Sequence, residues 1–526
     1  MKQRSPWVIF IVLLSGIFVT LEANAFLTPA LPYIAKQFAL PTQFVGIVTV
    51  CYYITAIALA PLFGRLGDQI GRKKIVVAGM LIFSLSEFLA SFSPTLTVFL
   101  IARVIQGFGY ACIFPNVFAY ISDIFTEEKR GRAIGIFMLF IYIATGTGGL
   151  ISGFLIETFN WRAIFVTSGT LAFIGFLLVA IFVPSTTLQV AKTKLNYTGA
   201  VIFMVFIASV VSIPMSIGFF GLFSPFTLIQ FGLIFVILAS LLMYDRRSEA
   251  PTLDLSVLKI RGIAVSAILI TGQNIIMLSI LYTLMFYGAN RADWTAVGIG
   301  LITTVNFSIA AIISPFIGRY LDKYRPVYLI IFALASSLVG VTIFYFVNMS
   351  SSLTYVLLVM VFIGICSGCI NAALMKIVIT EAPEGKKGVG TGLFTLFKDL
   401  GLPLGATFGS TLYGISQSKG FENNIAVVAA DNGINAKLSN DILTANTTGE
   451  ISSTLSSALS SANITFEALV YQINNLSTEF AIQTIALVCF GLCLFIIILS
   501  LTLLKKSPKL EQEQNTIILK EDVAKS

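Results

Sequence analysis

The stretch Pro61-Leu62-Phe63-Gly64-Arg65-Leu66-Gly67-Asp68 returns later in the chain as Pro315-Phe316-Ile317-Gly318-Arg319-Tyr320-Leu321-Asp322. The two copies share the pattern Pro-x-x-Gly-Arg-x-x-Asp and begin at 61 and 315, an offset of 254 residues, so the chain contains an internal repeat. Each copy ends a long hydrophobic run, carries basic residues and is followed at once by another hydrophobic run. This arrangement predicts two tight cytoplasmic turns between membrane helices, and duplicated membrane halves are typical of transporters.

The composition identifies the bilayer as the solvent of this chain. Hydrophobic residues make up 57% of the 526 residues, charged residues only 11%, and the mean hydropathy is +0.92. Soluble domains hold about 25% charged residues, so a soluble globule is excluded. Apolar segments of roughly 20 residues satisfy their backbone polar groups as helices in lipid, and alternating ten-residue strands are not seen. We therefore expect an all-α polytopic membrane protein.

About fourteen hydrophobic runs have the length of a membrane span. They lie near 7–30, 44–63, 75–93, 95–122, 133–157, 163–183, 198–219, 225–244, 262–288, 294–316, 326–347, 353–379, 389–415 and 479–504. The repeat offset is too long for six helices alone but suits six plus an inserted pair. The predicted domains are a six-helix bundle at 1–183, two linker helices and a loop at 184–261, a second six-helix bundle at 262–504, and a cytoplasmic tail at 505–526.

The lysine and arginine residues indicate the orientation of the chain. Alternate loops and both termini carry roughly 25 of them on one side and about 5 on the other, so both termini are expected in the cytoplasm, below a plasma membrane. The net charge of +8 is divided among short clusters, which argues against nucleic acid as a partner. All six cysteines lie in apolar runs and histidine is missing, so neither a disulfide framework nor a metal site is expected.

One connection, at 416–478, is much longer than the others on the outer face. It is rich in Ser, Asn and Thr, but Phe466, Leu469, Val470, Ile473 and Leu476 keep helical spacing. We therefore predict a long outer loop in which an amphipathic segment folds against the outer mouth of the bundle. Three Asn-x-Ser/Thr triplets in this loop carry little weight, because such triplets arise by chance in this composition.

Several motifs resemble those of the major facilitator superfamily. The segment Gly64 to Lys74 is similar to the loop between its helices two and three, and Leu100 to Gly109, with Pro115 and Asp123, is similar to its helix-four motif. The stretches Leu21 to Pro32 and Pro251 to Leu255 resemble motifs of its fourteen-helix drug:proton antiporters. The resemblance implies two six-helix bundles around a central cavity, with proton-coupled export of lipophilic, often cationic small molecules.

Two departures from the family pattern bear on this expectation. The helix-five antiporter motif usually carries Gly-Pro followed by a Gly pair, whereas this chain has Gly148-Gly149 and Ser152-Gly153 without the proline. This departure weakens the case for antiport. At the acidic position of helix one the family commonly has Asp, and here Glu22 keeps the charge and adds one methylene.

Glu22 is the predicted proton carrier, because a carboxylate in mid-membrane is costly and usually functional. Position 276 corresponds to Glu22 across the repeat, and Gln273 and Asn274 beside it give a polar spot at similar depth in the second half. A hydrogen-bonded structural carboxylate is the alternative interpretation.

Arg103, Gln106, Gly107 and Tyr110 share one helical face, so Arg103 is expected to point into the bundle and to pair with Glu22 or Glu87. Such a pair would make protonation sensitive to the contents of the cavity, although it could also be a permanent structural ion pair. Glu87 has no counterpart in the family pattern and is either a chain-specific substrate contact or a residue near an outer helix end.

Two further charges belong to the predicted cavity. Lys398 matches a basic position of the family's thirteenth helix, and Asp399 stands where an amide is more usual. Adjacent residues of a helix point about 100° apart, so these two side chains are not expected to pair.

The repeated motif is predicted to act as a conformational latch rather than as a substrate site. Its glycines would allow a tight turn, Asp68 would bind a helix N-terminus or a cation such as Arg130 or Arg132, and Arg72 would stay with lipid headgroups. The alternative is that the motif only sets topology. The predicted latch residues are Gly64, Arg65, Asp68, Gly71, Arg72, Gly318, Arg319 and Asp322.

The expected function is therefore secondary transport of a small molecule by two rocking bundles, in a monomer in the lipid bilayer, with protons as the coupled ion and no cofactor. The chain has no Gly-x-x-x-x-Gly-Lys-Ser/Thr loop with which to use ATP. Two alternatives stay open. One is a carrier for a defined metabolite, lipid precursor or siderophore by symport or uniport, and the other is a membrane receptor or scaffold with the same architecture.

Overall fold

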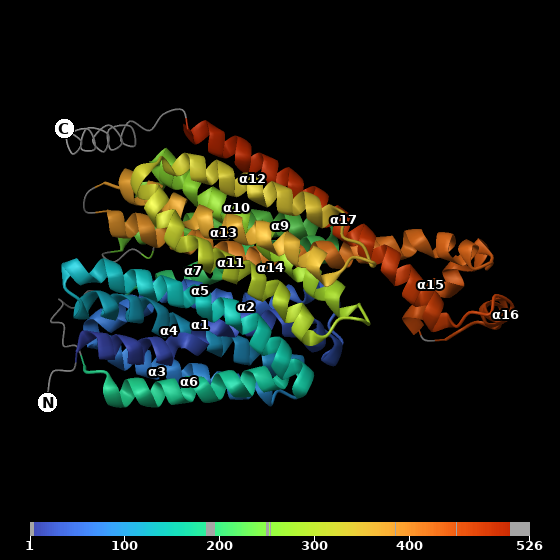
Figure 1. Ribbon diagram of the computed structural model, residues 1–526, viewed down its shortest axis with the longest axis horizontal. Coiled ribbons are helices and arrows are strands. Elements are labelled where there is room, and N and C mark those ends of the chain that lie inside the picture. The colour runs from blue at the N-terminus through green and yellow to red at the C-terminus, as the bar shows by residue number, and fades with distance from the viewer. Residues whose placement is uncertain are drawn as a thin grey trace.

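The structure, a computed structural model, describes residues 5–185, 195–248, 252, 254–383, 386–448 and 450–504 (Figure 1). Within these ranges some helical side chains lie outside the description, namely those at 19, 21–24, 122, 127–128, 130–131, 134–135, 138, 322–323, 448 and 502–504.

The N-terminal half consists of six long helices, joined by short connections that include a 3-10 turn, η1 (Thr42–Phe44). These helices are α1 (Pro6–Gln37), α2 (Gly46–Ile70), α3 (Arg72–Ser91), α4 (Leu96–Ile124), α5 (Glu127–Thr158) and α6 (Arg162–Phe182). In this half, α3 packs against both α4 and α6, α2 packs against α4, and α1 packs against α5 and α6.

The linker contains α7 (Tyr197–Val211), α8 (Ile213–Phe220), α9 (Pro225–Arg247) and a 3-10 turn, η2 (Leu255–Lys259). The C-terminal half follows with α10 (Arg261–Ala289), α11 (Ala296–Lys323), α12 (Pro326–Tyr345), α13 (Leu353–Glu381), α14 (Lys387–Asp431) and α17 (Phe466–Leu504). Between α14 and α17 lie η3 (Ala436–Leu438), α15 (Ser439–Thr448) and α16 (Ser453–Ser461).

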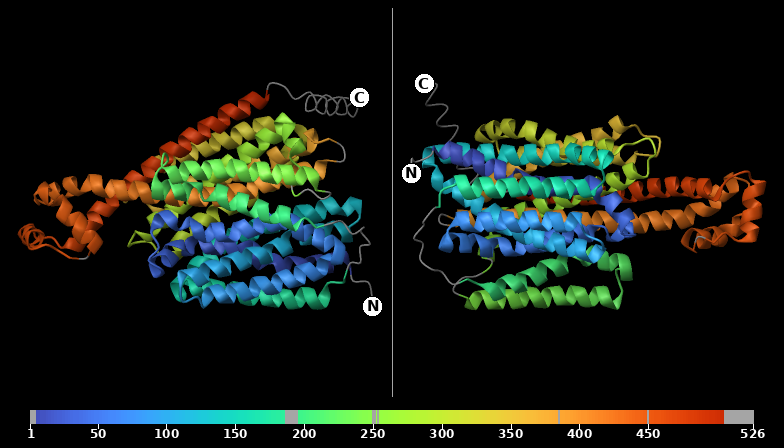
Figure 2. Two further views of the ribbon diagram at one scale, coloured as in Figure 1. Left: turned by 180° about the vertical axis from the view of Figure 1, so that it is seen from behind. Right: turned by 90° about the horizontal axis from the view of Figure 1, so that it is seen from below.

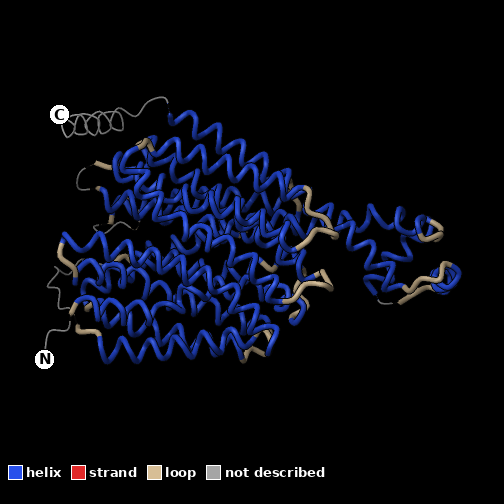
Figure 3. The backbone as a smooth tube through the Cα atoms, in the orientation of Figure 1, coloured by secondary structure: helices blue, strands red, loops and turns tan. Residues whose placement is uncertain are grey.

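The helices have the length and composition of membrane spans. Among the described residues, eleven helices are long and apolar enough to cross a membrane, or twelve if α7 and α8, which meet at a 44° bend, form one span. Each predicted run overlaps one helix or the α7–α8 pair. All regular structure in the described ranges is helical (Figure 3), so the predicted all-α polytopic fold is confirmed.

Two ends of the bundle can be distinguished in Figures 1 and 2. The start of α1 and the end of α17 lie at one end, which we call the terminus end. At the opposite end, the extension end, α14 and α17 continue past the other helices and carry α15 and α16. The N-terminal and C-terminal halves lie side by side along the long axis between these two ends.

The two halves touch most closely where glycines bring backbones together. A Cβ added at Gly149 of α5 would lie 2.5 Å from the Gly300 carbonyl oxygen of α11, and one at Gly46 of α2 would lie 2.8 Å from Thr407 Cα of α14. Gly46 and Gly300 are separated by the same 254 residues as the two motif copies, so the repeat builds both crossings. Both glycines lie near the extension-end starts of their helices.

The opposite ends of the same C-terminal helices are not packed in this way. A Cβ at Gly318 of α11, or at Gly388 or Gly392 of α14, would meet no heavy atom within 4 Å. In this conformation the halves are therefore closed on each other at the extension end.

The prediction that the motif copies are tight turns is wrong. Pro61 to Asp68 belongs to the last turns of α2, and Pro315 to Asp322 to those of α11. The turn after the first copy is a single residue, Gly71, whose φ of 102° is favourable only for glycine. Its N–H closes α2 by donating to the Gly67 carbonyl at 2.9 Å. Neither a proline in α2 nor one in α11 ends its helix.

The predicted long loop at 416–478 is also wrong, because most of this segment is helical. We call residues 416–478 the extension. The expected amphipathic segment is part of α17, and its Leu469 and Ile473 are buried against Phe421 and Ile425 of α14 and Leu455 of α16. The extension projects along the long axis instead of folding against the bundle mouth (Figure 1), because its apolar residues form a hydrophobic core of their own.

We expect Gly300→Val to open the extension end, because the added side chain would collide with the Gly149 backbone. Closure can be measured by disulfide formation between cysteines placed at Gln43 and Thr411, since the Thr411 hydroxyl of α14 donates to the Gln43 carbonyl of η1 at 3.0 Å. Cross-linking should fall several-fold in the Gly300→Val background. Gly318→Val, on the same helix but in open space, should leave it unchanged, and equal cross-linking in both backgrounds would refute a closing role for this crossing.

Candidate functional site

The site that the structure describes best is a polar cluster buried in the N-terminal half. Arg103 and Gln106 come from α4 and Glu87 from α3, and each side chain is at most 1% exposed. An Arg103 Nη1–H donates to Gln106 Oε1, and Gln106 Nε2–H donates to Glu87 Oε1. Arg103 thus reaches Glu87, one of its two predicted partners, through an amide rather than in a direct ion pair.

Neighbouring helices complete the cluster. The Arg103 guanidinium carbon lies 4.9 Å from the ring centroid of Tyr52 on α2, and Ser168 of α6 donates to Glu87 Oε1 at 3.2 Å. Gly107 has the role expected of it, because a Cβ there would overlap the Tyr52 carbonyl and separate α4 from α2.

Two atoms of this cluster keep unused bonding capacity. Glu87 Oε2 and Arg103 Nη2 are buried, and the described residues give neither a hydrogen-bond partner. Leaving one buried charged partner incompletely satisfied is unfavourable, typically by several kcal/mol for an ion. Buried groups of this kind are more often functional than structural.

The predicted proton carrier, Glu22, cannot be placed in this way. Its backbone belongs to α1, but its side chain lies outside the described residues.

A contact between the two halves adjoins the cluster. The Val48 carbonyl of α2 accepts from Arg103 Nε at 3.2 Å. The next residue, Thr49, shares a hydrogen bond with the Tyr282 hydroxyl of α10. Sequence reasoning missed Thr49, Ser168 and Tyr282, because uncharged hydroxyls in apolar helices give no signal until their neighbours are known.

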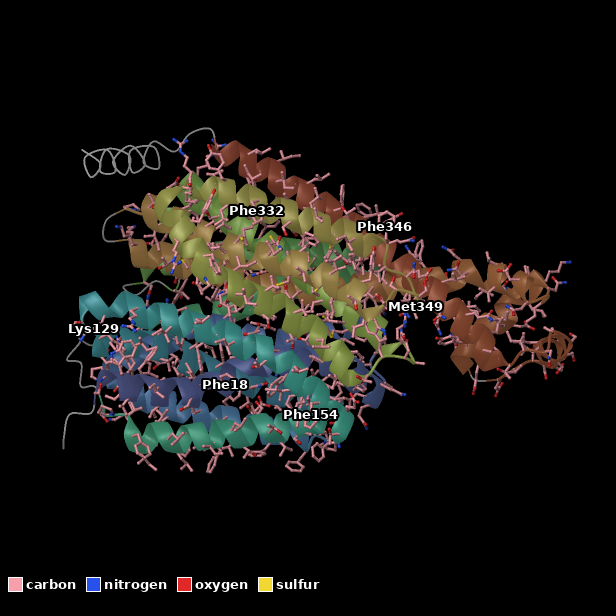
Figure 4. The ribbon with its side chains drawn as sticks, in the orientation of Figure 1. Phe18, Lys129, Phe154, Phe332, Phe346 and Met349 are labelled. Atoms are coloured by element: carbon pink, nitrogen blue, oxygen red, sulfur yellow. The ribbon has the colours of Figure 1, made fainter. Side chains whose placement is uncertain are left out.

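Aromatic side chains extend from the cluster toward the terminus end. Tyr110 packs its ring 5.6 Å from that of Tyr52 and stacks on Phe114 at 5.4 Å. Phe18 of α1, labelled in the middle of the N-terminal half in Figure 4, packs 5.2 Å from Phe140 of α5. Sequence reasoning singled out Tyr110 but not the other rings of this group.

Some polar groups of the C-terminal half lie near this aromatic group. Asp399 of α14 lies within electrostatic reach of the Tyr53 and Tyr110 hydroxyls on the other half. Its side chain is 28% exposed, and Lys398 Nζ lies 3.6 Å from its Oδ1. The expectation that Lys398 and Asp399 do not pair is therefore wrong, because the long lysine side chain spans the angle between the two positions.

Gln273 and Asn274 differ in their surroundings. Asn274 Nδ2–H donates to the Lys398 carbonyl at 2.8 Å and so joins α10 to α14. Gln273 is 1% exposed, and its side-chain oxygen and nitrogen have no hydrogen-bond partner among the described residues. The predicted polar spot of the second half is thus divided between two helix faces.

The latch motif of the N-terminal half forms an ion cluster at the terminus end. Arg72 Nη2 lies 2.9 Å from Asp68 Oδ1, and Arg72 Nη1 pairs with Asp123 of α4. The expected headgroup position of Arg72 is wrong, because its side chain is only 13% exposed. Arg132 does not bind Asp68 but stacks 5.6 Å from the Trp7 ring, and the Arg130 side chain is not described.

The latch motif of the C-terminal half has no such cluster among its described residues. Gly318 and Arg319 are exposed, and the Asp322 side chain lies outside the description. In the first copy, a Cβ added at Gly64 would lie 3.6 Å from Pro115 Cβ of α4. Arg65 is half-buried in α2. The repeat therefore preserves the sequence pattern but not the surroundings of its residues.

The linker is held to the C-terminal half by a separate ion pair. Asp254 lies 3.2 Å from Lys386, which precedes α14 and also donates to Ser256 at 2.8 Å. Hydrogen bonds from Ser256, and then the lysine charge, lower the pKa of Asp254 from its ordinary value. The pair lies outside the membrane-spanning helices.

Within the described part of the chain, no three cysteine or acidic side chains are grouped so that they could hold a metal ion. The buried polar cluster instead lies inside the N-terminal half, around Arg103 and Glu87, and adjoins the contact with the C-terminal half, where Thr49 meets Tyr282. A multi-pass helical bundle with this arrangement defines a membrane transporter rather than an enzyme.

The chain belongs to the Major Facilitator Superfamily, whose sequence model matches residues 9–406. It is 24% identical over 402 residues to multidrug resistance protein Stp of Mycobacterium tuberculosis strain H37Rv, covering 76% of this chain and 74% of the relative. It is also 24% identical over 416 residues to riboflavin transporter RibZ of Clostridioides difficile strain 630, covering 78% and 89%.

Solved structures agree with this fold. A bacterial homologue of the human lysosomal transporter Spinster, in an inward-facing and unoccupied conformation, aligns with a TM-score of 0.67 at 14% identity, covering 97% of this chain and all of that one. The nucleoside transporter NupG aligns with a TM-score of 0.59 at 12% identity. The extension lies beyond the residues that the family model matches.

We expect the Arg72 cluster to stabilise the N-terminal half. Asp123→Asn should lower the free energy of unfolding in detergent by about 2 kcal/mol, the typical loss for a hydrogen bond to a charged group. In a double-mutant cycle, Arg72→Lys and Asp123→Asn should be non-additive because they remove the same pair. Arg319→Lys, at an exposed site of the second motif copy, is the control and should change nothing measurable. Additive effects of the two cluster variants would contradict a shared interaction.

Proposed function

We propose that this transporter exports lipophilic, often cationic small molecules in exchange for protons, as a member of the fourteen-helix drug:proton antiporter branch. It works as a monomer in the plasma membrane with both termini in the cytoplasm, so the terminus end is the cytoplasmic end. Substrate enters between the halves and leaves at the extension end after the halves separate at the two glycine crossings. The names of the multidrug resistance relatives support this proposal at the level of substrate class.

The observation that carries the substrate class is that α14 packs against Tyr53 of the other half through Leu396 and Leu400, on either side of Asp399, and that Asp399 lies within electrostatic reach of the Tyr53 and Tyr110 hydroxyls. A carboxylate beside aromatic faces attracts an organic cation by charge and by the negative faces of the rings. Apolar ring surface also binds the lipophilic body of such a compound without demanding a fixed shape. Lipophilic cations combine both properties.

Lys398 does not prevent this role. Its nitrogen is 3.6 Å from Asp399 and the two side chains are 32% and 28% exposed. Partly solvated pairs of this kind contribute only about 0.2–1 kcal/mol. A bound cation can therefore replace the lysine as the partner of Asp399 at small cost.

Energy for export comes from the proton gradient. Glu22 is the proposed proton carrier by position in α1, and the buried Arg103, Gln106 and Glu87 form a second group whose charge would respond to occupancy of the site. A carboxylate in a medium of low polarity carries its charge only when a partner stabilises it. Movement of cargo or water near such a partner changes proton binding, and this link is what coupled transport requires.

A second candidate is a carrier for a defined aromatic metabolite. The similarity to riboflavin transporter RibZ favours it, as does the stacked pair of Tyr110 and Phe114, which could hold a planar ring system. The missing proline after Gly148 is compatible with symport or uniport by such a carrier.

We expect Asp399→Asn to reduce export of ethidium, a lipophilic cation, about tenfold, which corresponds to ~1.4 kcal/mol of lost charge interaction. Export of a neutral dye of similar size should change less than twofold, because the aromatic surface is intact. Dye efflux from cells lacking their own pumps measures both. Asp431→Asn, at the exposed end of the same helix, is the matched control. Equal losses for the cation and the neutral dye would rule out Asp399 as the cation-selecting group.

We expect the purified protein in liposomes to move protons opposite to ethidium, which a trapped pH-sensitive dye reports. Glu22→Gln should abolish uphill export driven by a pH gradient and retain downhill exchange, since the neutral amide binds no proton. Glu467→Gln, at an exposed site of the extension, is the control. Proton flow in the same direction as substrate, or none, would favour the metabolite carrier, and intact uphill export by Glu22→Gln would exclude Glu22.

A further inference from the structure

Four hydrogen-bonded steps and one covalent step, through the backbone between Thr49 and Val48, connect the C-terminal half to Glu87. The path begins at the Tyr282 hydroxyl of α10, which shares a hydrogen bond with Thr49 of α2 across the boundary between the halves. The peptide unit between Val48 and Thr49 carries it on, because the Val48 carbonyl accepts from Arg103 Nε at 3.2 Å. From Arg103 the path continues through the Gln106 amide to Glu87.

The first step of this path depends on closure of the halves. Thr49 lies three residues after Gly46, the residue at which α2 crosses α14 at the extension end. Gly46 itself donates its backbone N–H to Ser410 Oγ of α14 at 3.2 Å. When the halves separate at this end, Tyr282 and Thr49 must part as well, whereas every later step lies within the N-terminal half and can persist.

We propose that Tyr282 is a positioning residue that links closure of the extension end to protonation of Glu87. This inference rests on the proposed function, because it presupposes that transport is coupled to protons. It assigns the coupling to a carboxylate of α3 and to a hydroxyl of the opposite half. Tyr282 acts through Thr49 and Arg103. It neither binds the substrate nor takes up the transported proton.

The surroundings of Glu87 explain why closure would matter. Among the described side chains, Arg103 of α4 is the only charged group that acts on it, through Gln106, and α6 contributes the uncharged Ser168. The titratable groups facing Arg103 are Tyr52 and Cys51 of α2, Tyr282 of α10 and Glu87 itself. In this closed conformation Glu87 is 1% exposed and its Oε2 has no hydrogen-bond partner among the described residues, which favours the uncharged acid. Separation of the halves admits water, which favours the ion.

Tyr282→Phe tests this link, because it removes one hydroxyl and keeps the ring that packs there. The readout is the pH dependence of tetraphenylphosphonium binding to the full-length protein in detergent. Loss of the Thr49 bond favours the open state, so the midpoint should move to lower pH by at least about half a unit, or roughly threefold in proton affinity. Thr49→Val should do the same, and Thr49→Ser, which keeps the hydroxyl, should retain the wild-type midpoint.

Tyr287→Phe is the matched control. It lies on the same helix and also loses a buried hydroxyl bond, but its partner is the Asn348 carbonyl within the C-terminal half, at 2.8 Å. The Tyr287 hydroxyl also accepts from Arg291 of the same half at 3.1 Å. Because both partners lie within the C-terminal half, its midpoint should equal that of the wild type, whereas Glu87→Gln should remove the transition assigned to Glu87. An unshifted Tyr282→Phe midpoint, or an unchanged transition in Glu87→Gln, overturns the inference.

These outcomes can be separated from failure of the proposed function. If wild-type liposomes drive ethidium export with a pH gradient while Tyr282→Phe keeps the wild-type midpoint, only the link is wrong. If the wild type drives no such export, the antiport proposal fails, and a shifted binding midpoint would still show that Tyr282 controls a proton site.

Discussion

Close contact between backbones at the extension end is the constraint on which the arrangement of the two halves depends. Gly149 meets Gly300 and Gly46 meets Thr407 with no room for a side chain at either glycine. Two such contacts, built by equivalent positions of a repeated sequence, hold the halves together at one end, whereas Gly318, Gly388 and Gly392 at the other end lie in open space. Contacts between small residues can separate and re-form without rotamer changes, which suits a structure that rocks.

Buried charge is the second feature that organises the molecule. An isolated guanidinium or carboxylate inside a membrane protein is unfavourable by several kcal/mol. The opposite charges of Arg103 and Glu87 therefore stabilise each other. They meet through Gln106, which accepts from one and donates to the other. An amide between the charges leaves one atom of each without a hydrogen-bond partner among the described residues, so each can accept a further partner. A direct ion pair at this position would satisfy the charges more fully and respond less to its surroundings.

The sequence predicted the fold far better than the surroundings of individual residues. Hydrophobic length and the repeat located the membrane helices, because apolar length alone determines a span. They did not reveal that Asp68 binds Arg72, or that Arg72 also reaches Asp123, because these contacts depend on how α2, α3 and α4 meet. The face shared by Arg103 and Gln106 was predictable from helical spacing, but Thr49 and Tyr282 were not. The helical extension was missed because its Ser- and Thr-rich surface conceals a sparse apolar core.

Because α14 and α17 are unbroken helices, the extension moves as a rigid continuation of the C-terminal half. Both helices continue from the membrane bundle into residues 416–478 without interruption, and α14 is also the helix that crosses Gly46. The α14 part alone reaches roughly 24 Å past position 416, at about 1.5 Å per residue. A small rotation of the C-terminal half is therefore magnified at the tip. Spin labels or fluorophores at exposed tip residues would report the swing of that half while leaving the membrane interior untouched.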